Sequence, residues 1–182
     1  MTAPVDTTRR EAARLLKRVR QIRDFRSDPV PEDLLTEILD VARWTGSAQN
    51  RQPWNLVVLR DATLRRRIAE IGAPSTTHVG RAPLAVAVVM EGKGDVIDAF
   101  DEGRVAERIL DAASVLGLAS AIGWVKREHR AEVHDLLGVR DPAFVRTIVS
   151  IGYSTDASAR PKSAPGTARK PLAELVQQDR LT

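Results

Sequence analysis

The sequence contains no cysteine among its 182 residues, and only 4% of its residues are aromatic. Without cysteine there can be no disulfide, no thiolate nucleophile and no zinc–thiolate site. No apolar run approaches the ~20 residues that a membrane-spanning helix needs, and the first residues carry no apolar stretch of the signal-peptide kind. We therefore expect a soluble, cytoplasmic protein whose chemistry comes from a bound cofactor or from oxygen and nitrogen side chains.

Several catalytic motifs are also missing. The turn Gly92-Lys93-Gly94 lacks the spacing of a phosphate-binding P-loop, and no GxGxxG follows an apolar strand. His129 and His134 are five residues apart, which does not place two metal ligands on one helix face, and neither HExxH nor a serine elbow occurs. We therefore expect no metal centre, no acyl-enzyme hydrolysis and no Rossmann-type dinucleotide site.

The charge balance is basic, with 28 Lys and Arg against 24 Asp and Glu and a formal net charge of +4. Such a surplus suits anionic partners in general, so phosphorylated ligands, nucleic acid and a solvated surface all remain open. A hydrophobic content of 43% over this length favours one domain, residues 1–182, with one sizeable core.

Helical and strand patterns alternate along the chain. Three helices are predicted by their starts, at the capping-box residue Thr8, after Pro31 and after the N-cap Asp61, and two more are predicted over residues 101–117 and 128–137. Strands are predicted over residues 55–59, 84–90, 118–125 and 145–151. This alternation predicts a layered sheet with helices on both faces. The tail 154–170 lacks core periodicity and ends in an amphipathic piece, 171–178. A partner subunit is the simplest surface for such a tail to lie upon.

Four arginines are clustered near the N-terminus, namely Arg18, Arg20, Arg23 and Arg26. Guanidinium groups bind a phosphate monoester bidentately, so the cluster suits a mononucleotide phosphate. A solvated basic face explains the same pattern. Nucleic-acid binding is a third interpretation, but only Phe25 is interleaved as a stacking residue, which weakens it.

The octet Ser47-Ala48-Gln49-Asn50-Arg51-Gln52-Pro53-Trp54 joins a predicted helix to a predicted strand. Each side-chain amide offers a donor and an acceptor, which complements a heterocycle edge that alternates C=O and N–H, as a flavin pyrimidine does. The alternative is a surface loop whose amides satisfy its own backbone. The small residues of 116–124 would let the backbone approach a flat ligand, and ordinary helix-to-strand packing explains them equally well.

Taken together, these segments resemble the FMN-dependent nitroreductase family. Residues 20–25 (RQIRDF) and 29–31 (PVP) resemble the opening R-S-I-R-x-F…PVP of that family, and the octet resembles its P-S-x-x-N-x-Q-P-W. Further resemblances follow in the same order at Asp101-Glu102-Gly103, Gly117-Leu118, Ser150-Ile151-Gly152-Tyr153 and Arg169-Lys170-Pro171-Leu172.

The resemblance implies an α+β fold of three layers, a central mixed β-sheet flanked by helices, in a homodimer whose C-terminal arms, about 154–182, embrace the neighbouring subunit. It implies FMN as cofactor and NAD(P)H as co-substrate. The phosphate would lie among Arg20, Arg23 and Arg169, with Arg18 and Gln21 nearby. The isoalloxazine would be lined by Ser47, Ala48, Asn50 and Gln52, from one subunit or from both, and by the backbone around Ile122 and Gly123.

The implied activity is hydride transfer from NAD(P)H through flavin N5 to a nitroaromatic, a quinone or a similar small acceptor, with no obligatory side-chain acid or base. We expect neither a nucleic-acid nor a membrane partner. Two departures keep an alternative open. Val19 stands where the family often has its first arginine, and only ten residues separate Met90 from Asp101, where many members carry a helical excursion. The alternative is a flavin-binding protein of the same fold that does not turn over.

Overall fold

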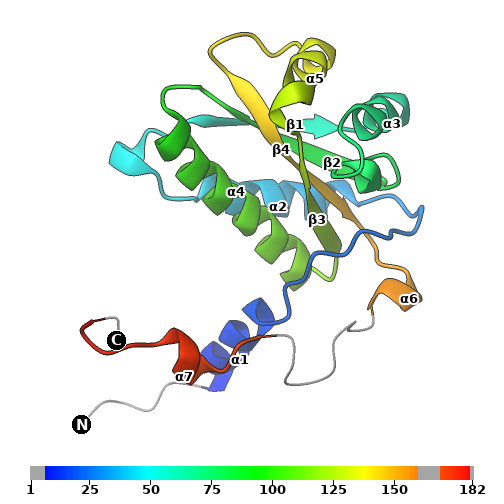
Figure 1. Ribbon diagram of the computed structural model, residues 1–182. Coiled ribbons are helices and arrows are strands. Elements are labelled where there is room, and N and C mark those ends of the chain that lie inside the picture. Colours follow the sequence, from blue (N-terminus) through cyan, green and yellow to red (C-terminus); the bar gives the residue numbers. More distant parts are fainter. Residues whose placement is uncertain (1–6, 160–168, 181–182) are drawn as a thin grey trace.

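The computed structural model of the chain describes residues 7–159 and 169–180 (Figure 1). The helices are α1 (Thr7–Leu16), α2 (Glu32–Arg43), α3 (Ala62–Ile71), α4 (Asp95–Val115), α5 (Arg130–Leu137), α6 (Asp156–Ala159) and α7 (Leu172–Leu175). The strands are β1 (Trp54–Leu59), β2 (Leu84–Met90), β3 (Ala119–Trp124) and β4 (Phe144–Gly152). Short 3-10 helices are η1 (Ala48–Asn50), η2 (Thr77–Val79) and η3 (Arg127–His129).

The strands form one sheet in the order β1-β2-β4-β3, and every pairing within it is antiparallel. A mixed sheet was predicted, which requires parallel pairing. Within the described residues, the parallel pairing is limited to an isolated bridge between Gln21 and Ser120 of the edge strand β3. Every residue of the central strand β2 is buried, as its continuous apolar sequence predicts.

Two hydrophobic layers pack on the sheet. On one face, α2 and α4 cover the side chains of Leu84, Val86 and Val88. On the other face, α3 and α5 cover Ala85 and Ala87. Figure 1 shows these helix pairs on opposite sides of the strands. The predicted α+β fold of three layers is confirmed.

Local signals in the sequence account for most of the element boundaries. The carboxylate of Asp61 caps α3 by accepting from the backbone N–H of Thr63 at 2.6 Å and of Leu64 at 3.1 Å. The predicted start of the long helix at Asp101 is wrong, because α4 begins six residues earlier, at Asp95. The apolar residues of its first turns point to solvent and show no core periodicity, while Asp98 accepts from the N–H of Gly94 at 3.1 Å.

The terminal helices lie outside the three layers. Figure 1 shows α1 and α7 beyond the sheet, with α1 joined to the body near the C-terminal end of α4. Part of the predicted aperiodic tail, 160–168, is outside the described residues, and the amphipathic piece forms α7. None of the helices in the described ranges is long and apolar enough to cross a membrane.

Candidate functional site

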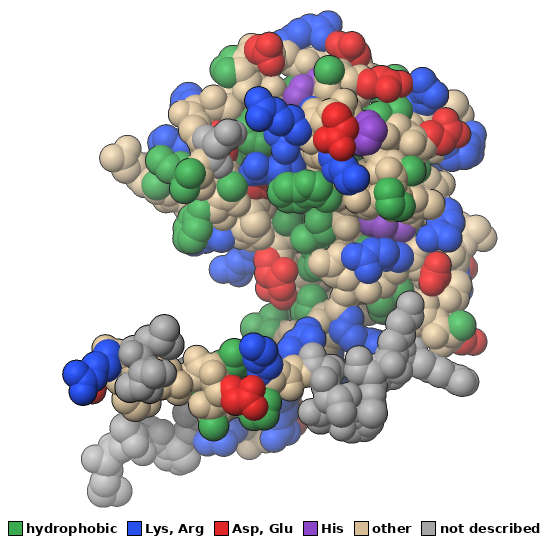
Figure 2. All heavy atoms as spheres, in the orientation of Figure 1, with side chains coloured by type: hydrophobic (Ala, Val, Ile, Leu, Met, Phe, Trp, Pro, Cys, Tyr) green, Lys and Arg blue, Asp and Glu red, His purple; other side chains and the backbone are tan. Residues whose placement is uncertain are grey.

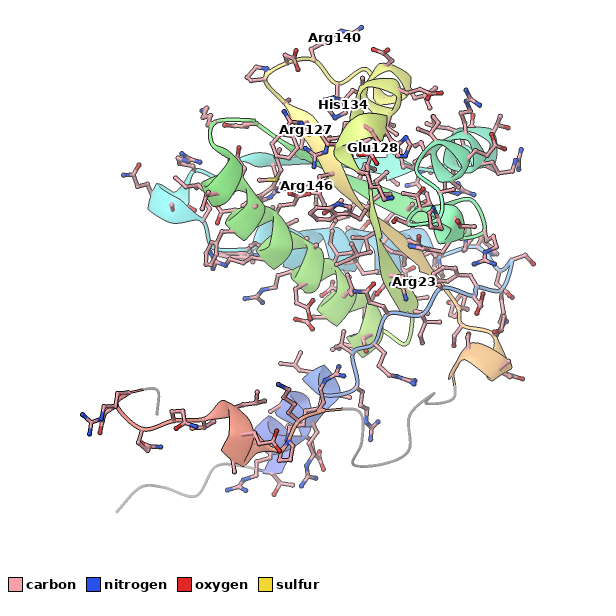
Figure 3. The ribbon with its side chains drawn as sticks, viewed as in Figure 1. Arg23, Arg127, Glu128, His134, Arg140 and Arg146 are labelled. Atoms are coloured by element: carbon pink, nitrogen blue, oxygen red, sulfur yellow. The ribbon has the colours of Figure 1, made fainter. Side chains whose placement is uncertain are left out.

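The arginine-rich segment is attached to the edge of the sheet. The N–H of Ile22 donates to the carbonyl oxygen of Ser120 at 2.9 Å. The side-chain oxygen of Gln21 accepts from the N–H of Ile122 at 3.1 Å and from the guanidinium of Arg23 at 3.0 Å. These bonds bring Gln21, Arg23 and Ile122 together, three of the residues predicted to contact a cofactor. Figure 3 shows Arg23 on this segment beside β3.

The other predicted phosphate ligands lie on exposed surface. Arg18 is in the turn that follows α1, Arg20 is two residues further along, and Arg169 begins the described segment that carries α7. The guanidinium of Arg26 donates to the carboxylate of Asp28 at 2.8 and 2.9 Å. The convergence of Arg20, Arg23 and Arg169 on one phosphate, with Arg18 nearby, stays a prediction.

A buried histidine behind β3 was not among the predicted site residues. His78, on η2, is 2% exposed; its Nδ1 lies 2.6 Å from Ser150 Oγ and its Nε2 lies 3.2 Å from the carbonyl oxygen of Ile122. Because a carbonyl only accepts, Nε2 carries the proton and Nδ1 accepts from the Ser150 hydroxyl. Both backbone polar groups of Ile122 are therefore paired, one with Gln21 and the other with His78.

Glycine at position 123 allows this arrangement. A Cβ added there would lie 3.2 Å from Cγ2 of Val79, the residue that follows His78. The absence of a side chain thus lets η2 pack closely against β3. Gly123 acts in the structure as a packing position, and its contact with a cofactor stays a prediction.

Burial lowers the pKa of His78 to about 4, with a further contribution from the positive charge of Arg23. The pKa of this imidazole in the unfolded chain is about 6.5. At pH values between about 6.5 and about 4, His78 is protonated in the unfolded chain and neutral in the folded chain, so acid favours unfolding. We expect this residue to remove roughly 2–3 kcal/mol of stability between about pH 7 and about pH 4.5.

The His78→Gln variant tests this expectation through urea unfolding at the two pH values. The variant is less stable than the parent at neutral pH, and the gap should narrow as the solution is acidified, because glutamine has no proton to bind. An equal gap at both pH values would contradict the assignment.

The octet folds into a strained turn that displays its amides. Gln49, Asn50 and Gln52 have φ values of 55°, 54° and 50°, in the left-handed region that side-chain-bearing residues rarely adopt. The hydroxyl oxygen of Ser47 accepts from the N–H of Gln52 at 2.8 Å, and the Gln52 amide donates to Asn50 Oδ1 at 3.3 Å. Strain of this kind persists where the surrounding structure enforces it, often at functional sites.

Two contacts hold the octet against the first half of α4. Arg51, which was not predicted as a site residue, lies 3.9 Å from the fully buried carboxylate of Asp98. Ser47 and Ala48 line a cavity together with Val96, Ile97 and Phe100 of α4. Asn50 and Gln52 are exposed beside it.

The two groups of predicted ligands therefore lie toward opposite ends of α4. The octet meets the helix between Val96 and Arg104, whereas Gln21 pairs with Ser120, just beyond the end of the helix at Val115. The stretch of α4 from Arg104 to its end at Val115 is roughly 16 Å long. Within one chain, the arginine segment and the octet therefore do not lie side by side.

Comparison with known proteins agrees with the residue patterns. The model of the nitroreductase family matches residues 16–88. A candidate NADH dehydrogenase/NAD(P)H nitroreductase of Methanothermobacter thermautotrophicus is 29% identical over 171 residues, covering 91% of this chain and 83% of that protein. The NADH dehydrogenase of Thermus thermophilus is 46% identical over 87 residues, 48% of this chain and 41% of that protein.

A solved structure shows the same fold over nearly its whole length. The FMN-dependent nitroreductase from Clostridium difficile superposes with a TM-score of 0.82 at 22% identity, covering 92% of this chain and 98% of that one. The chain is thus a protein of the nitroreductase fold. Its resemblance to the nitroreductase family, first seen in the order of its motifs, is confirmed.

Proposed function

We propose that the protein is an FMN-dependent oxidoreductase that passes hydride from NAD(P)H to a small acceptor such as a nitroaromatic or a quinone. The observation that carries the proposal is the attachment of the arginine segment to β3, through Gln21 and Ile122, which sets Arg23 beside the strand predicted to flank the flavin. The related proteins are named as NAD(P)H-dependent and FMN-dependent reductases, which supports the same reaction class.

The donor set of the chain fits FMN. A phosphate monoester needs cationic donors, and the segment from Arg18 to Arg23 supplies three guanidinium groups next to a neutral amide. The ring edge of a flavin needs donors and acceptors in alternation, which Asn50 and Gln52 supply from a backbone that is held in place. Arg20, Arg23 and Arg169 would hold the phosphate, while Ser47, Ala48, Asn50 and Gln52 would line the ring.

Two chains are needed to complete such a site. The separation of the arginine segment from the octet along α4 supports a homodimer in which each flavin contacts the arginine segment of one chain and the octet of the other. Large apolar side chains are exposed on α1, α4 and α7, and contact with a second copy would remove their surface from water. They include Leu16, Val96, Phe100, Val115, Leu172 and Leu175.

When bound, FMN supplies the redox chemistry by accepting hydride from NAD(P)H and returning it to the second substrate. The chain contributes binding and electrostatics. Cationic groups and amide donors favour the negative charge that the ring carries when reduced. No side chain of the described site is assigned as an obligatory acid or base.

The direct test is the colour and reducibility of the purified protein. We expect a yellow protein with about one FMN per chain that bleaches on addition of NAD(P)H and recovers its colour with a quinone or a nitroaromatic. A colourless protein that does not take up added FMN would overturn the proposal.

The alternative, a flavin-binding protein without turnover, predicts the same colour. It is favoured by Val19, which is partly buried against the hydrophobic core and cannot supply a phosphate contact. Steady-state NAD(P)H oxidation with a panel of quinones and nitro compounds separates the two, because a pure binding protein would give no rate above that of free FMN.

A further inference from the structure

A cavity opens between α3 and the loop through η2, on the face of the sheet opposite α4. It has a volume of about 380 Å³ and is lined by Arg66, Ala69 and Glu70 of α3 and by Thr77, Gly80 and Arg81 of the loop. Figure 1 shows α3 on the far side of the strands from α4 and away from α1 and α7. The helices whose exposed apolar side chains suit a second copy therefore leave this cavity accessible.

The two walls of the cavity meet where Gly80 packs on α3. A Cβ added to Gly80 would lie 3.0 Å from the Cβ of Ala69, which is 8% exposed, and 3.3 Å from the Cα of Arg66. Glycine thus lets the loop approach the helix closely, and a larger residue would push the walls apart. The methyl groups of Ala69 and Ala73 leave an apolar surface between the charged side chains of the rim.

The charge of the cavity is positive. The guanidinium of Arg66 donates to the hydroxyl oxygen of Thr63 at 3.1 Å and has no carboxylate partner among the described residues. Glu70 is the acidic residue of the lining, and its carboxylate lies 3.6 Å from the guanidinium of Arg67, which offsets its charge. Two arginines, Arg66 and Arg81, therefore face an anion with little opposition.

Arg81 connects the cavity to the arginine segment. Its guanidinium lies 3.6 Å from the carboxylate of Asp24 and 3.5 Å from the carbonyl oxygen of Arg23. The side chains of Arg81 and Asp24 are 57% and 54% exposed, and an exposed ion pair of this kind contributes little free energy. An anion in the cavity can therefore replace Asp24 as the partner of Arg81. Figure 2 shows Lys and Arg side chains, interspersed with acidic ones, along this right-hand edge of the molecule.

We propose that the cavity binds a small organic carboxylate through Arg66 and Arg81, and that the bound carboxylate weakens the hold of the arginine segment on the FMN phosphate. Guanidinium groups donate bidentately to a carboxylate, and the apolar surface between them contacts its hydrocarbon part. When Arg81 binds the ligand, the charge of Asp24 is no longer compensated and competes with the phosphate for Arg23. Only this effect on FMN rests on the proposed function.

The first measurement is the binding of hexanoate, an aliphatic carboxylate with no ring to stack on a flavin. Two-dimensional NMR titration of the isotope-labelled protein gives the dissociation constant, and the amide shifts should be concentrated between Ala69 and Arg81. We expect Arg66→Met to weaken binding about 10-fold or more, as for loss of a hydrogen bond to a charged group. Arg140→Met, which removes an exposed arginine outside the cavity, should leave it unchanged. Hexanamide, which lacks the charge, should bind about 10-fold more weakly than hexanoate or worse.

The second measurement concerns the link to the arginine segment. In Asp24→Asn, Arg81 loses its competing carboxylate, and hexanoate should bind about 2- to 5-fold more tightly. In the parent, saturating hexanoate at constant ionic strength should raise the dissociation constant of FMN by a similar factor. Arg66→Met should abolish this effect over the same range of hexanoate concentration.

The outcomes separate this inference from the proposed function. Shifts scattered over the surface, or an Arg66→Met protein with unchanged hexanoate affinity, would overturn the carboxylate site. Hexanoate binding that leaves FMN affinity unchanged would overturn its action on the arginine segment. A protein that takes up no FMN would refute the proposed function, and the hexanoate titration would still test the site. Arg66 is exposed, and thermal unfolding checks that its replacement leaves the fold intact; Arg66→Lys, which loses the planar fork, serves as the test if it does not.

Discussion

Replacing Arg20 and Arg23 together with alanine is expected to lower the affinity for FMN by about 10²- to 10⁴-fold, since each lost charged hydrogen bond to phosphate weakens binding by about 10- to 100-fold. The protein should purify colourless while keeping its fold. Fluorescence titration with FMN measures the dissociation constant. Riboflavin, which lacks the phosphate, should bind the parent and the variant with similar, weaker affinity.

Arg26→Ala is the matched control for this double variant. Arg26 belongs to the same sequence cluster, but its guanidinium is already paired with Asp28. Its removal should leave FMN affinity within a few-fold of the parent. If the double variant kept a full complement of FMN, or if Arg26→Ala lost as much affinity, the phosphate would lie elsewhere.

The second large effect concerns stability. Glu102 of α4 forms a buried ion pair with Arg146 of β4, whose Nε donates at 2.8 Å, and the two side chains are 2% and 10% exposed. The guanidinium of Arg146 lies 5.2 Å from the ring centroids of both Trp124 and Phe144. Figure 3 shows Arg146 in the middle of the fold. Glu102→Leu would leave this cation buried without a counter-charge, and we expect a loss of about 3–5 kcal/mol.

Removing both charges should reverse much of this loss. In Glu102→Leu/Arg146→Met, the pair is replaced by apolar side chains of similar length, and stability should recover by several kcal/mol relative to Glu102→Leu. Urea unfolding of the parent, the two single variants and the double variant gives the coupling energy. A double variant as unstable as the sum of the two single variants would contradict the coupling.

Much of the fold could be predicted because its signals are local. The apolar run of β2, the Asp61 cap and the helical spacing of α2 each identify an element without reference to the rest of the chain. The start of α4 could not be placed, since the apolar residues of its first turns face outward and break the core pattern. Parallel pairing was expected in the sheet and is limited to the bridge at Gln21.

The site was predictable in its residue types and less so in its geometry. The amides of the octet and the clustered arginines stand out in the sequence, but nothing local reveals the positive φ values at Gln49 and Asn50. The buried position of His78 could not be predicted from the sequence, because its hydrogen-bond partner Ser150 is 72 residues away and comes close to it only in the folded sheet. The separation of the two ligand groups likewise follows from the length of α4 and the place of β3.

The flavin site that we propose is shared between two chains, and complementation tests this most directly. One chain carries Arg20→Ala and Arg23→Ala, the other carries Asn50→Ala and Gln52→Ala, and differently tagged copies are expressed together so that the mixed dimer can be purified. Each variant homodimer should lack flavin. The mixed dimer assembles one site from two intact halves and should hold about one FMN with about half the activity of the unsubstituted homodimer. A mixed dimer as colourless as either variant homodimer would contradict the shared site.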